Sequence, residues 1–309
     1  MSELHGICPA CHAQALLSET LQTDVLAAHW ARTQAHGSAT TEQIVDFVRG
    51  DIGSKTVEIY RCPVCGLEFM RPAHTWSAAH YPHEPHSLGW DHAETLRALA
   101  KLPAQTVLDV GCATGQFLDR LVAAGHQATG IDFSPEDVEE AKARGHEAFV
   151  ADLSRQNALV AAGRRFSVIT MYQVIEHLEQ PDLVFEGISQ VAAPGALLFI
   201  GCPSSQRYTR GFRHPELAGS SDFWDSPPQH VFRWTPEALR KFTARHGWQL
   251  ERTAFEPLQA YHAAAHLAGL GAYSGRPWAR RAATVGYFLR LKTSNLTGIR
   301  LFASARRAV

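Results

Sequence analysis

The feature that most constrains the fold is an alternation of short apolar runs with amphipathic segments from residue 101 onward. The apolar runs have the length of strands, and the amphipathic segments have helical periodicity. Such an alternation predicts parallel strands covered by helices on both faces of one sheet. We therefore expect an α/β fold of the doubly wound type in this part of the chain.

Seven strands are predicted along this region. They cover residues 106–110, 127–131, 148–150, 166–172, 196–201, 248–255 and 298–305. Pro181 and the pair Thr235-Pro236 predict helix starts, because proline is favoured in a first turn and threonine caps helix N-termini. Residues 257–296 are expected to form a helical insertion.

The loop after the first of these strands, from Asp109 to Gly115, predicts a ligand site. Gly111 and Gly115 allow a tight turn and a close backbone approach to a ligand at the carboxyl end of the strand. Asp132 ends the next strand, 21 residues after Gly111. At this spacing an acidic side chain can accept hydrogen bonds from ribose hydroxyls.

The charge around this loop indicates which nucleotide-like ligand it suits. A dinucleotide site needs Gly-x-Gly-x-x-Gly, but Ala113 and Gln116 occupy the second and third glycine positions. Asp109, Asp132 and Asp152 stand at three successive strand ends and favour a phosphate-free ligand with cationic groups. S-adenosylmethionine, which carries an ammonium and a sulfonium, meets this description.

These motifs together resemble the class I S-adenosylmethionine-dependent methyltransferases. The segments that carry the resemblance are residues 107–115, Asp132, Asp152-Leu153, Glu176-His177-Leu178 and Pro194-Gly195. The resemblance implies a mainly parallel, seven-stranded Rossmann-like sheet whose last strand is antiparallel. It also implies that Gly111 and Gly115 face the methionine part of the cofactor, Asp132 the ribose, and Asp152 with Leu153 the adenine.

Two histidines are candidates for a catalytic base. In methyl transfer the protein mainly orients the nucleophile and, where needed, removes its proton. His177 follows the fourth strand and is the first candidate, and His230 is the second. Each could instead be a structural histidine bonded to the backbone or buried in the core.

Gln173, which follows the fourth strand directly, is expected to contact the cofactor. Some ubiquinone-pathway O-methyltransferases, which resemble this chain, carry Glu-x-x-Glu-His with a divalent metal at this strand end. Gln173 stands where the first of those glutamates would be. This replacement argues against a catalytic magnesium.

Four cysteines form two pairs, Cys8 with Cys11 and Cys62 with Cys65. A two-residue spacer lets both thiolates of a pair point into one tetrahedron, so the two pairs predict a structural zinc site with four thiolates. A redox-active pair, an iron–sulfur centre and plain buried thiols remain alternatives. The gap between the pairs exceeds that of a compact zinc ribbon, and residues 18–48 are expected to form one or two inserted helices.

The chain is therefore expected to have three parts. Residues 1–75 form a zinc-ribbon-like module with a helical insertion, residues 76–100 a linker or lid, and residues 101–309 the methyltransferase domain. Histidines and aromatic residues are dense in the segment 74–92, which suits a lid over the active cleft, a plain linker or, less directly, a second metal site.

Composition limits the partners of the protein. The 29 Lys and Arg residues nearly balance the 30 Asp and Glu residues, so the broad positive charge of a nucleic-acid-binding protein is missing. No apolar run is long enough to span a membrane, and the first residues do not resemble a secretory signal. A cytoplasmic location is expected, and the sequence gives no indication of the oligomeric state.

We expect the protein to transfer a methyl group from S-adenosylmethionine to an O, N or C atom of a small molecule, with sugars and secondary metabolites among the candidate acceptors. An RNA methyltransferase is one alternative, because residues 276–307 contain eight Lys or Arg residues and no acid. A non-catalytic scaffold that binds the cofactor is the other.

Overall fold

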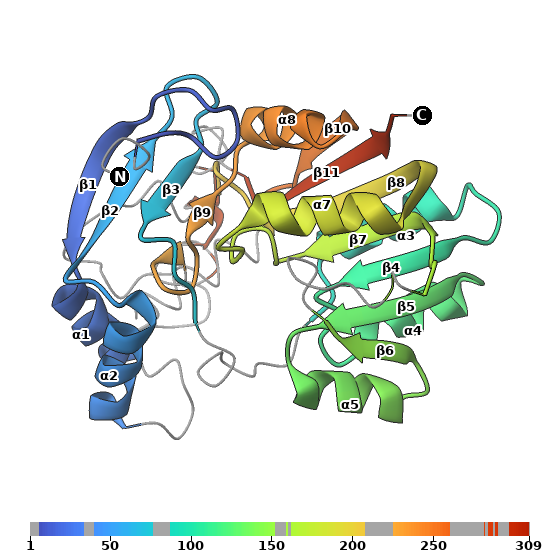
Figure 1. Cartoon of the computed structure of the whole chain (residues 1–309), viewed down its shortest axis with the longest axis horizontal. Coiled ribbons are helices and arrows are strands. Elements are labelled where there is room, and N and C mark those ends of the chain that lie inside the picture. The colour runs from blue at the N-terminus through green and yellow to red at the C-terminus, as the bar shows by residue number, and fades with distance from the viewer. Residues whose placement is uncertain are drawn as a thin grey trace.

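The computed structural model describes residues 6–33, 40–76, 87–151, 159, 162–207, 225–259, 281, 284–286, 288–289 and 297–308. Within these residues the chain forms two β-sheets, a small one near the N-terminus and a large one that carries most of the remaining elements (Figure 1). Some parts of the sequence prediction lie outside the described residues. These are Asp152 and Leu153, the three histidines between residues 77 and 86, and most of the segment 257–296.

The large sheet has seven strands in the order β10-β11-β8-β7-β4-β5-β6. Their bounds are β4 (Thr106–Val110), β5 (Gln127–Asp132), β6 (Glu147–Val150), β7 (Phe166–Tyr172), β8 (Ala192–Pro203), β10 (Trp248–Phe255) and β11 (Arg300–Arg307). The pairs from β6 to β8 are parallel, and β11 is antiparallel to both of its neighbours. The expected α/β fold with an antiparallel last strand is thus confirmed.

Helices cover both faces of this sheet. The helices are α3 (Trp90–Leu99), α4 (Gln116–Ala123), α5 (Pro135–Ala143), α7 (Pro181–Val191) and α8 (Pro236–Arg245). Successive residues of β4 belong to different cores, since Val107 packs with α3 and α4 whereas Leu108 belongs to the core under α7 and α8. This alternation is why the strand is apolar throughout.

The predicted helix starts are present. Ser134 accepts a hydrogen bond from the backbone N–H of Asp137 at the start of α5, and Thr235 accepts one from Ala238 at the start of α8. Pro181 occupies the first turn of α7. These caps satisfy amide groups that the helices leave unpaired.

Four strands differ in their bounds from the sequence prediction. The strand β5 ends one residue later than predicted, at Asp132, and β6 begins one residue earlier, at Glu147. The fifth strand of the large sheet, β8, extends beyond 196–201 at both ends, because Ala192 already pairs with Phe166 and Pro203 still pairs with Arg300. The last strand, β11, begins at Arg300 rather than at residue 298. Tertiary pairing partners, which the local pattern does not contain, set these ends.

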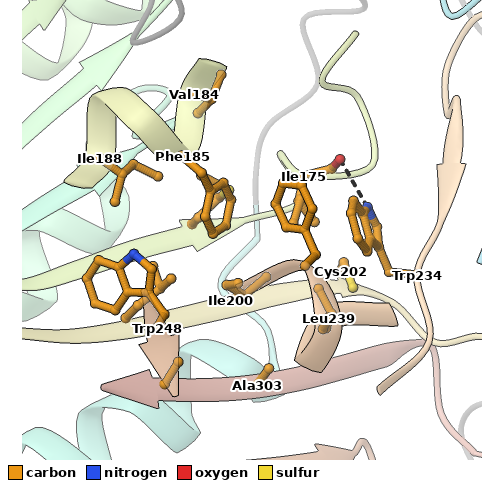
Figure 2. Close-up of a cluster of buried hydrophobic side chains, with 14 of the residues drawn as sticks. Ile175, Val184, Phe185, Ile188, Ile200, Cys202, Trp234, Leu239, Trp248 and Ala303 are labelled. Atoms are coloured by element: carbon orange, nitrogen blue, oxygen red, sulfur yellow. Dashed lines mark hydrogen bonds between the residues drawn. The ribbon is translucent and has the colours of Figure 1, made fainter. Parts of the chain in front are cut away.

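The core between β7, β8 and the helices α7 and α8 is shown in Figure 2. It contains Phe185, Trp234 and Trp248, each nearly inaccessible to solvent. The indole N–H of Trp234 donates a hydrogen bond to the carbonyl of Ile175, 3.1 Å away (Figure 2). This bond ties the chain just before α8 to the end of β7, which carries candidate site residues.

The small sheet has the order β1-β2-β3-β9 and is antiparallel. Its strands are β1 (Leu16–Gln22), β2 (Thr56–Arg61), β3 (Glu68–Arg71) and β9 (Phe232–Arg233). The helices α1 (Thr23–Thr33) and α2 (Thr41–Ile52) follow β1 and share a core with β2 and β3. The strand β9 comes from the methyltransferase part of the chain, so that part supplies one edge of the N-terminal sheet.

The predicted helical insertion between the cysteine pairs is partly wrong. Two helices are present, but residues 18–22, which we expected to be helical, belong to β1. Their side chains are almost all exposed, so no buried face imposes alternation on the sequence. Pairing with β2, from Leu16 opposite Arg61 to Gln22 opposite Thr56, makes this segment a strand.

The segment expected to be a linker or lid contains regular structure. The helix α3 packs against β8 and β11 of the large sheet. It is capped at Gly89, whose backbone N–H donates to Nδ1 of His92. Residues 90–99 are therefore a covering helix of the large sheet.

Candidate functional site

A cavity of about 860 Å³ lies at the carboxyl ends of β4, β5 and β7. In doubly wound sheets this edge is where ligands bind. Predicted site residues gather here: Asp109, Gly111, Asp132, Gln173, His177 and His230 all line the cavity. Gly115 lies behind this lining, at the start of α4, with a φ of 83°.

The loop between β4 and α4 forms one wall of the cavity. Gly111 has a φ of 77°, which side-chain-bearing residues rarely adopt, and its backbone N–H donates to the carbonyl of Ile131. A Cβ atom at Gly111 would lie 2.3 Å from Cγ2 of Val174. Both the backbone conformation and the space available thus require glycine at this position.

Asp132 is buried and held by the backbone around it. Its Oδ2 accepts a hydrogen bond from the N–H of Ala113, and its Oδ1 accepts one from the N–H of Ser134, each at 2.9 Å. A carboxylate oxygen can accept more than one hydrogen bond. The carboxylate is therefore fixed in orientation and retains acceptor capacity toward the cavity, as binding of ribose hydroxyls requires.

Asp109 adds negative charge to the same wall. It accepts a hydrogen bond of 2.6 Å from the hydroxyl of Thr170. Burial raises the pKa of Asp109 to about 6, although the bond from Thr170 acts in the opposite direction. A cation bound nearby would stabilise the ionised form, so the site is electrostatically suited to a positively charged ligand.

Gln173 supplies a polar group without a partner in the described part of the chain. Its φ is 53°, in the left-handed region, and its amide nitrogen Nε2 is buried without a hydrogen-bond partner among the described residues. An unpaired buried donor costs about 1–3 kcal/mol unless a ligand satisfies it. The amide thus fits a ligand with an acceptor group, such as the carboxylate of S-adenosylmethionine.

His92 is a cavity residue that the sequence analysis did not assign to the site. Its ring lies 4.1 Å from that of Tyr172, and both residues line the cavity. The only sequence signal was the density of histidines before residue 100. That signal did not place His92 on a helix facing the strand ends, because the packing of α3 on the sheet is non-local.

The opposite wall of the cavity carries the two predicted histidines. Nδ1 of His177 donates to the carbonyl of Gln229, and Nδ1 of His230 lies 3.1 Å from Oδ1 of Asp225. The two rings meet edge to face with their centroids 4.6 Å apart. Burial lowers the pKa of His230, so its imidazole is neutral at pH 7 and able to accept a proton.

Glu176 lies next to these histidines. One potential ligand atom from each of Glu176, His177 and His230 falls within 4.8 Å of the others. Burial raises the pKa of Glu176 well above its usual value. Both carboxyl oxygens of Glu176 are buried without a hydrogen-bond partner among the described residues.

The four paired cysteines also converge. Sγ of Cys8 lies 3.5 Å from Sγ of Cys65, Sγ of Cys11 lies 3.5 Å from Sγ of Cys62, and all four sulfurs are within 4.8 Å of one another. Zn–S bonds of about 2.3 Å in a tetrahedron place the sulfurs about 3.8 Å apart. All four are free thiols. The donor set and its spacing fit a closed zinc site.

Comparison with known proteins identifies the family. A methyltransferase domain family matches residues 83–253, more than half of the chain. The ubiquinone biosynthesis O-methyltransferase of Xanthomonas campestris pv. campestris is 30% identical over 138 residues, which are 43% of this chain and 58% of the relative. The relative of the same name from Hahella chejuensis is 30% identical over 137 residues, with the same shares of the two chains.

Solved methyltransferase structures are among those similar to this chain. An S-adenosylmethionine-dependent methyltransferase from Archaeoglobus fulgidus has a TM-score of 0.47 and 14% identity, and the match covers 70% of this chain and 94% of that one. Within the described residues, no helix combines the length and apolar character needed to cross a membrane. From the family match and its seven-stranded sheet, we conclude that this chain belongs to the class I S-adenosylmethionine-dependent methyltransferases.

Proposed function

We propose that the protein transfers the methyl group of S-adenosylmethionine to a small-molecule acceptor. The observation that carries the proposal is that one cavity contains both the acidic cofactor wall, with Asp109 and Asp132, and two imidazoles, His177 and His230. The cofactor supplies a methyl group activated by a sulfonium. The histidines are available to orient an acceptor and to take its proton.

The acceptor side of the cavity favours a molecule of mixed polarity. Trp76, Leu178 and Leu183 offer apolar surface, and the side-chain oxygen of Gln229 is buried without a hydrogen-bond partner in the described part of the chain. Small-molecule sites commonly combine an apolar lining with a few placed polar groups. The name of the curated relatives favours an oxygen acceptor among the O, N and C atoms considered.

Described arginines of the basic segment 276–307 do not favour RNA. Arg306 forms an ion pair of 2.7 Å with Glu251, and Arg307 donates to the carbonyl of Ala192. Arg300 lies near Asp91 and Glu256. Side chains engaged in this way contribute less positive charge to a nucleic-acid surface. A small molecule therefore remains the proposed acceptor.

We further propose that Cys8, Cys11, Cys62 and Cys65 hold one structural zinc ion per chain. Both cysteine hairpins have the same backbone arrangement, since the residue after the second cysteine has a positive φ in each, 59° at His12 and 72° at Gly66. Four thiolates leave no coordination position for a substrate, so the ion would stabilise the fold. Free thiols of this kind suit a reducing compartment, consistent with the expected cytoplasmic location.

The decisive experiment supplies methyl-labelled S-adenosylmethionine and a host-cell extract to the purified protein. We expect label to accumulate in one small-molecule product and to accumulate more slowly with the Asp132→Ala variant at the same subsaturating concentration of cofactor. Label in the RNA fraction would favour the RNA alternative. Cofactor binding by calorimetry without any labelled product would favour the scaffold.

A further inference from the structure

Asp225 is a buried acid beside the cavity that the proposed function does not use. Its Oδ1 lies 3.1 Å from Nδ1 of His230, and its Oδ2 lies 2.6 Å from Nη2 of Arg207. Arg233 also forms an ion pair with this carboxylate, and its Nη2 donates a hydrogen bond to the backbone carbonyl of Asp225. The side chains of Asp225 and Arg207 are about 5% exposed. A carboxylate is thus held between two guanidinium groups and one imidazole.

We infer that Asp225 and His230 form a dyad in which His230 is the general base and Asp225 is the residue that positions it. The inference rests on the proposed function and assigns the base within it. It favours His230 over His177, which the sequence analysis placed first.

The charges around Asp225 fix its state. Arg207 and Arg233 hold the pKa of Asp225 well below its usual value despite burial, so the group is a carboxylate at neutral pH. A carboxylate only accepts hydrogen bonds, and Nδ1 of His230 must therefore carry the proton of their contact. The other ring nitrogen, Nε2, is then unprotonated in the neutral ring and is the one available to a ligand in the cavity.

This arrangement suits proton transfer. As the acceptor attacks, its O–H or N–H proton moves to Nε2 of His230, and the freed electron pair forms the new bond to the methyl carbon. The electrons of the broken S–C bond remain on sulfur, which becomes a neutral thioether. The resulting imidazolium is stabilised by the adjacent carboxylate of Asp225.

His177 has a different environment. Its Nδ1 donates to a neutral carbonyl, that of Gln229, and its Nε2 lies 3.9 Å from Oε1 of Glu176. The hydrogen-bond partner of Nδ1 is thus a neutral carbonyl in His177 and a carboxylate in His230. The described ionisable groups that face His230 are Asp225, Arg207, Arg233, His177 and Glu176. Of these groups, Asp225 is the one that forms a hydrogen bond with the ring of His230.

The first test is a long-range ¹H–¹⁵N correlation spectrum of the imidazoles in the wild-type protein, with His230 assigned by comparison with His230→Gln. We expect the Nδ1–H tautomer of His230 at pH 7.5. An Nε2–H tautomer would overturn the dyad. This measurement needs neither an acceptor nor a bound cofactor, so its failure is distinct from failure of the proposed function, which calorimetry with S-adenosylmethionine detects.

The second test is the pH profile of methyl transfer to the labelled acceptor found in the extract. Asp225→Asn should lower kcat roughly a hundredfold, leave the KM of S-adenosylmethionine unchanged, and move the acid limb of the profile to lower pH. The acid limb shifts in this direction because loss of the anion lowers the pKa of His230.

The matched control is Asp182→Asn, since Oδ1 of Asp182 lies 2.9 Å from Nε2 of His246 in a pair that does not line the cavity. It should keep the wild-type kcat and profile. A folded Asp225→Asn variant with the wild-type kcat and acid limb would overturn the inference. A metal-dependent activity would also overturn the inference. In that case a chelator would abolish the activity of the wild type, and a divalent ion would restore it while the four-cysteine site stayed without zinc. Such a result would make His230 a metal ligand.

Discussion

The two walls of the cavity are built in different ways. The cofactor wall comes from neighbouring strand ends and short turns, and Asp132 is held by the amides of Ala113 and Ser134, both within its own βα units. The opposite wall, which carries His177 and His230 and which we call the acceptor wall, depends on segments far away in the sequence. The indole of Trp30 in α1 donates a hydrogen bond of 2.7 Å to the carbonyl of Pro227, and Glu68 of β3 pairs with Arg233 of β9.

The cysteine hairpins take part in this support. The hydroxyl of Thr235 donates to the carbonyl of Cys65, and Arg245 of α8 donates to the carbonyl of Pro9. Phe69 of β3 pairs with Phe232 of β9. The N-terminal module therefore stabilises the chain on both sides of the acceptor wall, whereas the cofactor wall has its own local support. Four variants test whether cofactor binding and methyl transfer depend on different parts of the chain, as the contacts of the two walls indicate.

The largest effect is expected for Cys62→Ser. A structural zinc in small peptides contributes roughly 10 kcal/mol or more, which is comparable with the stability of a whole domain. We expect loss of the metal, loss of amide-exchange protection in β2, β3 and β9, and loss of methyl transfer. Elemental analysis should find about one zinc per chain in the wild type and none in the variant.

The same variant should bind S-adenosylmethionine with an affinity within about threefold of the wild type, because the hydrogen bonds that hold Asp132 come from the amides of Ala113 and Ser134. Cys202→Ala is the control, since Cys202 is a buried cysteine that does not belong to the group of four converging sulfurs, and its loss should leave the zinc content unchanged. Equal loss of cofactor binding and methyl transfer in Cys62→Ser would mean that the two walls fold as one.

Asp109→Asn tests whether the buried charge of Asp109 lowers the free energy of unfolding of the protein. The pKa of Asp109 is raised from 3.8 to about 6, so folding favours its protonated form. Its contribution to stability is complete below pH 4 and is lost as the pH rises through 6, at a cost of about 3 kcal/mol. The variant should be more stable than the wild type by up to this amount at pH 8 and similar to it at pH 4.

Urea unfolding at both pH values measures this difference, and calorimetry should show weaker binding of S-adenosylmethionine because the carboxylate is lost. A stability difference that is the same at pH 4 and pH 8 would show that Asp109 does not titrate in this range.

Asp132→Ala should weaken S-adenosylmethionine binding at least tenfold, or about 1.4 kcal/mol, because hydrogen bonds to the ribose hydroxyls are lost. Calorimetry is the measurement. Glu139→Ala is the control, since Glu139 is an exposed acid on α5 that forms an ion pair with Lys142. Equal affinity in Asp132→Ala and the wild type would reject the ribose assignment.

The sequence predicted several strands of the large sheet well because their determinants are local. The strands 106–110, 166–172 and 248–255 have the predicted bounds, and Asp132 follows its loop at a spacing set by one βα unit. Hydrophobic period, glycine and proline are visible within such a short window.

The acceptor wall could not be predicted to the same extent. The pairing of Phe232 with Phe69 and the contact of Asp225 with Arg207 join segments whose proximity depends on the completed fold. His230 was named from its residue type, but nothing in the local sequence indicated the carboxylate that orients it. The strand at residues 18–22 was missed for the same reason, since only its pairing with β2 makes it a strand.

The smallest effect is expected for Trp30→Phe, which removes one buried hydrogen bond to the acceptor wall and keeps an aromatic ring. We expect the free energy of unfolding to fall by about 1 kcal/mol and methyl transfer to slow severalfold, with unchanged affinity for S-adenosylmethionine. Trp248→Phe is a matched control, because Nε1 of Trp248 is also buried but has no hydrogen-bond partner among the described residues. Urea unfolding and labelled methyl transfer are measured for both variants. The comparison distinguishes the effect of losing the hydrogen bond from the effect of the smaller ring. If Trp248→Phe slowed transfer as much as Trp30→Phe, the contact between α1 and the segment before His230 would have no special part in the acceptor wall.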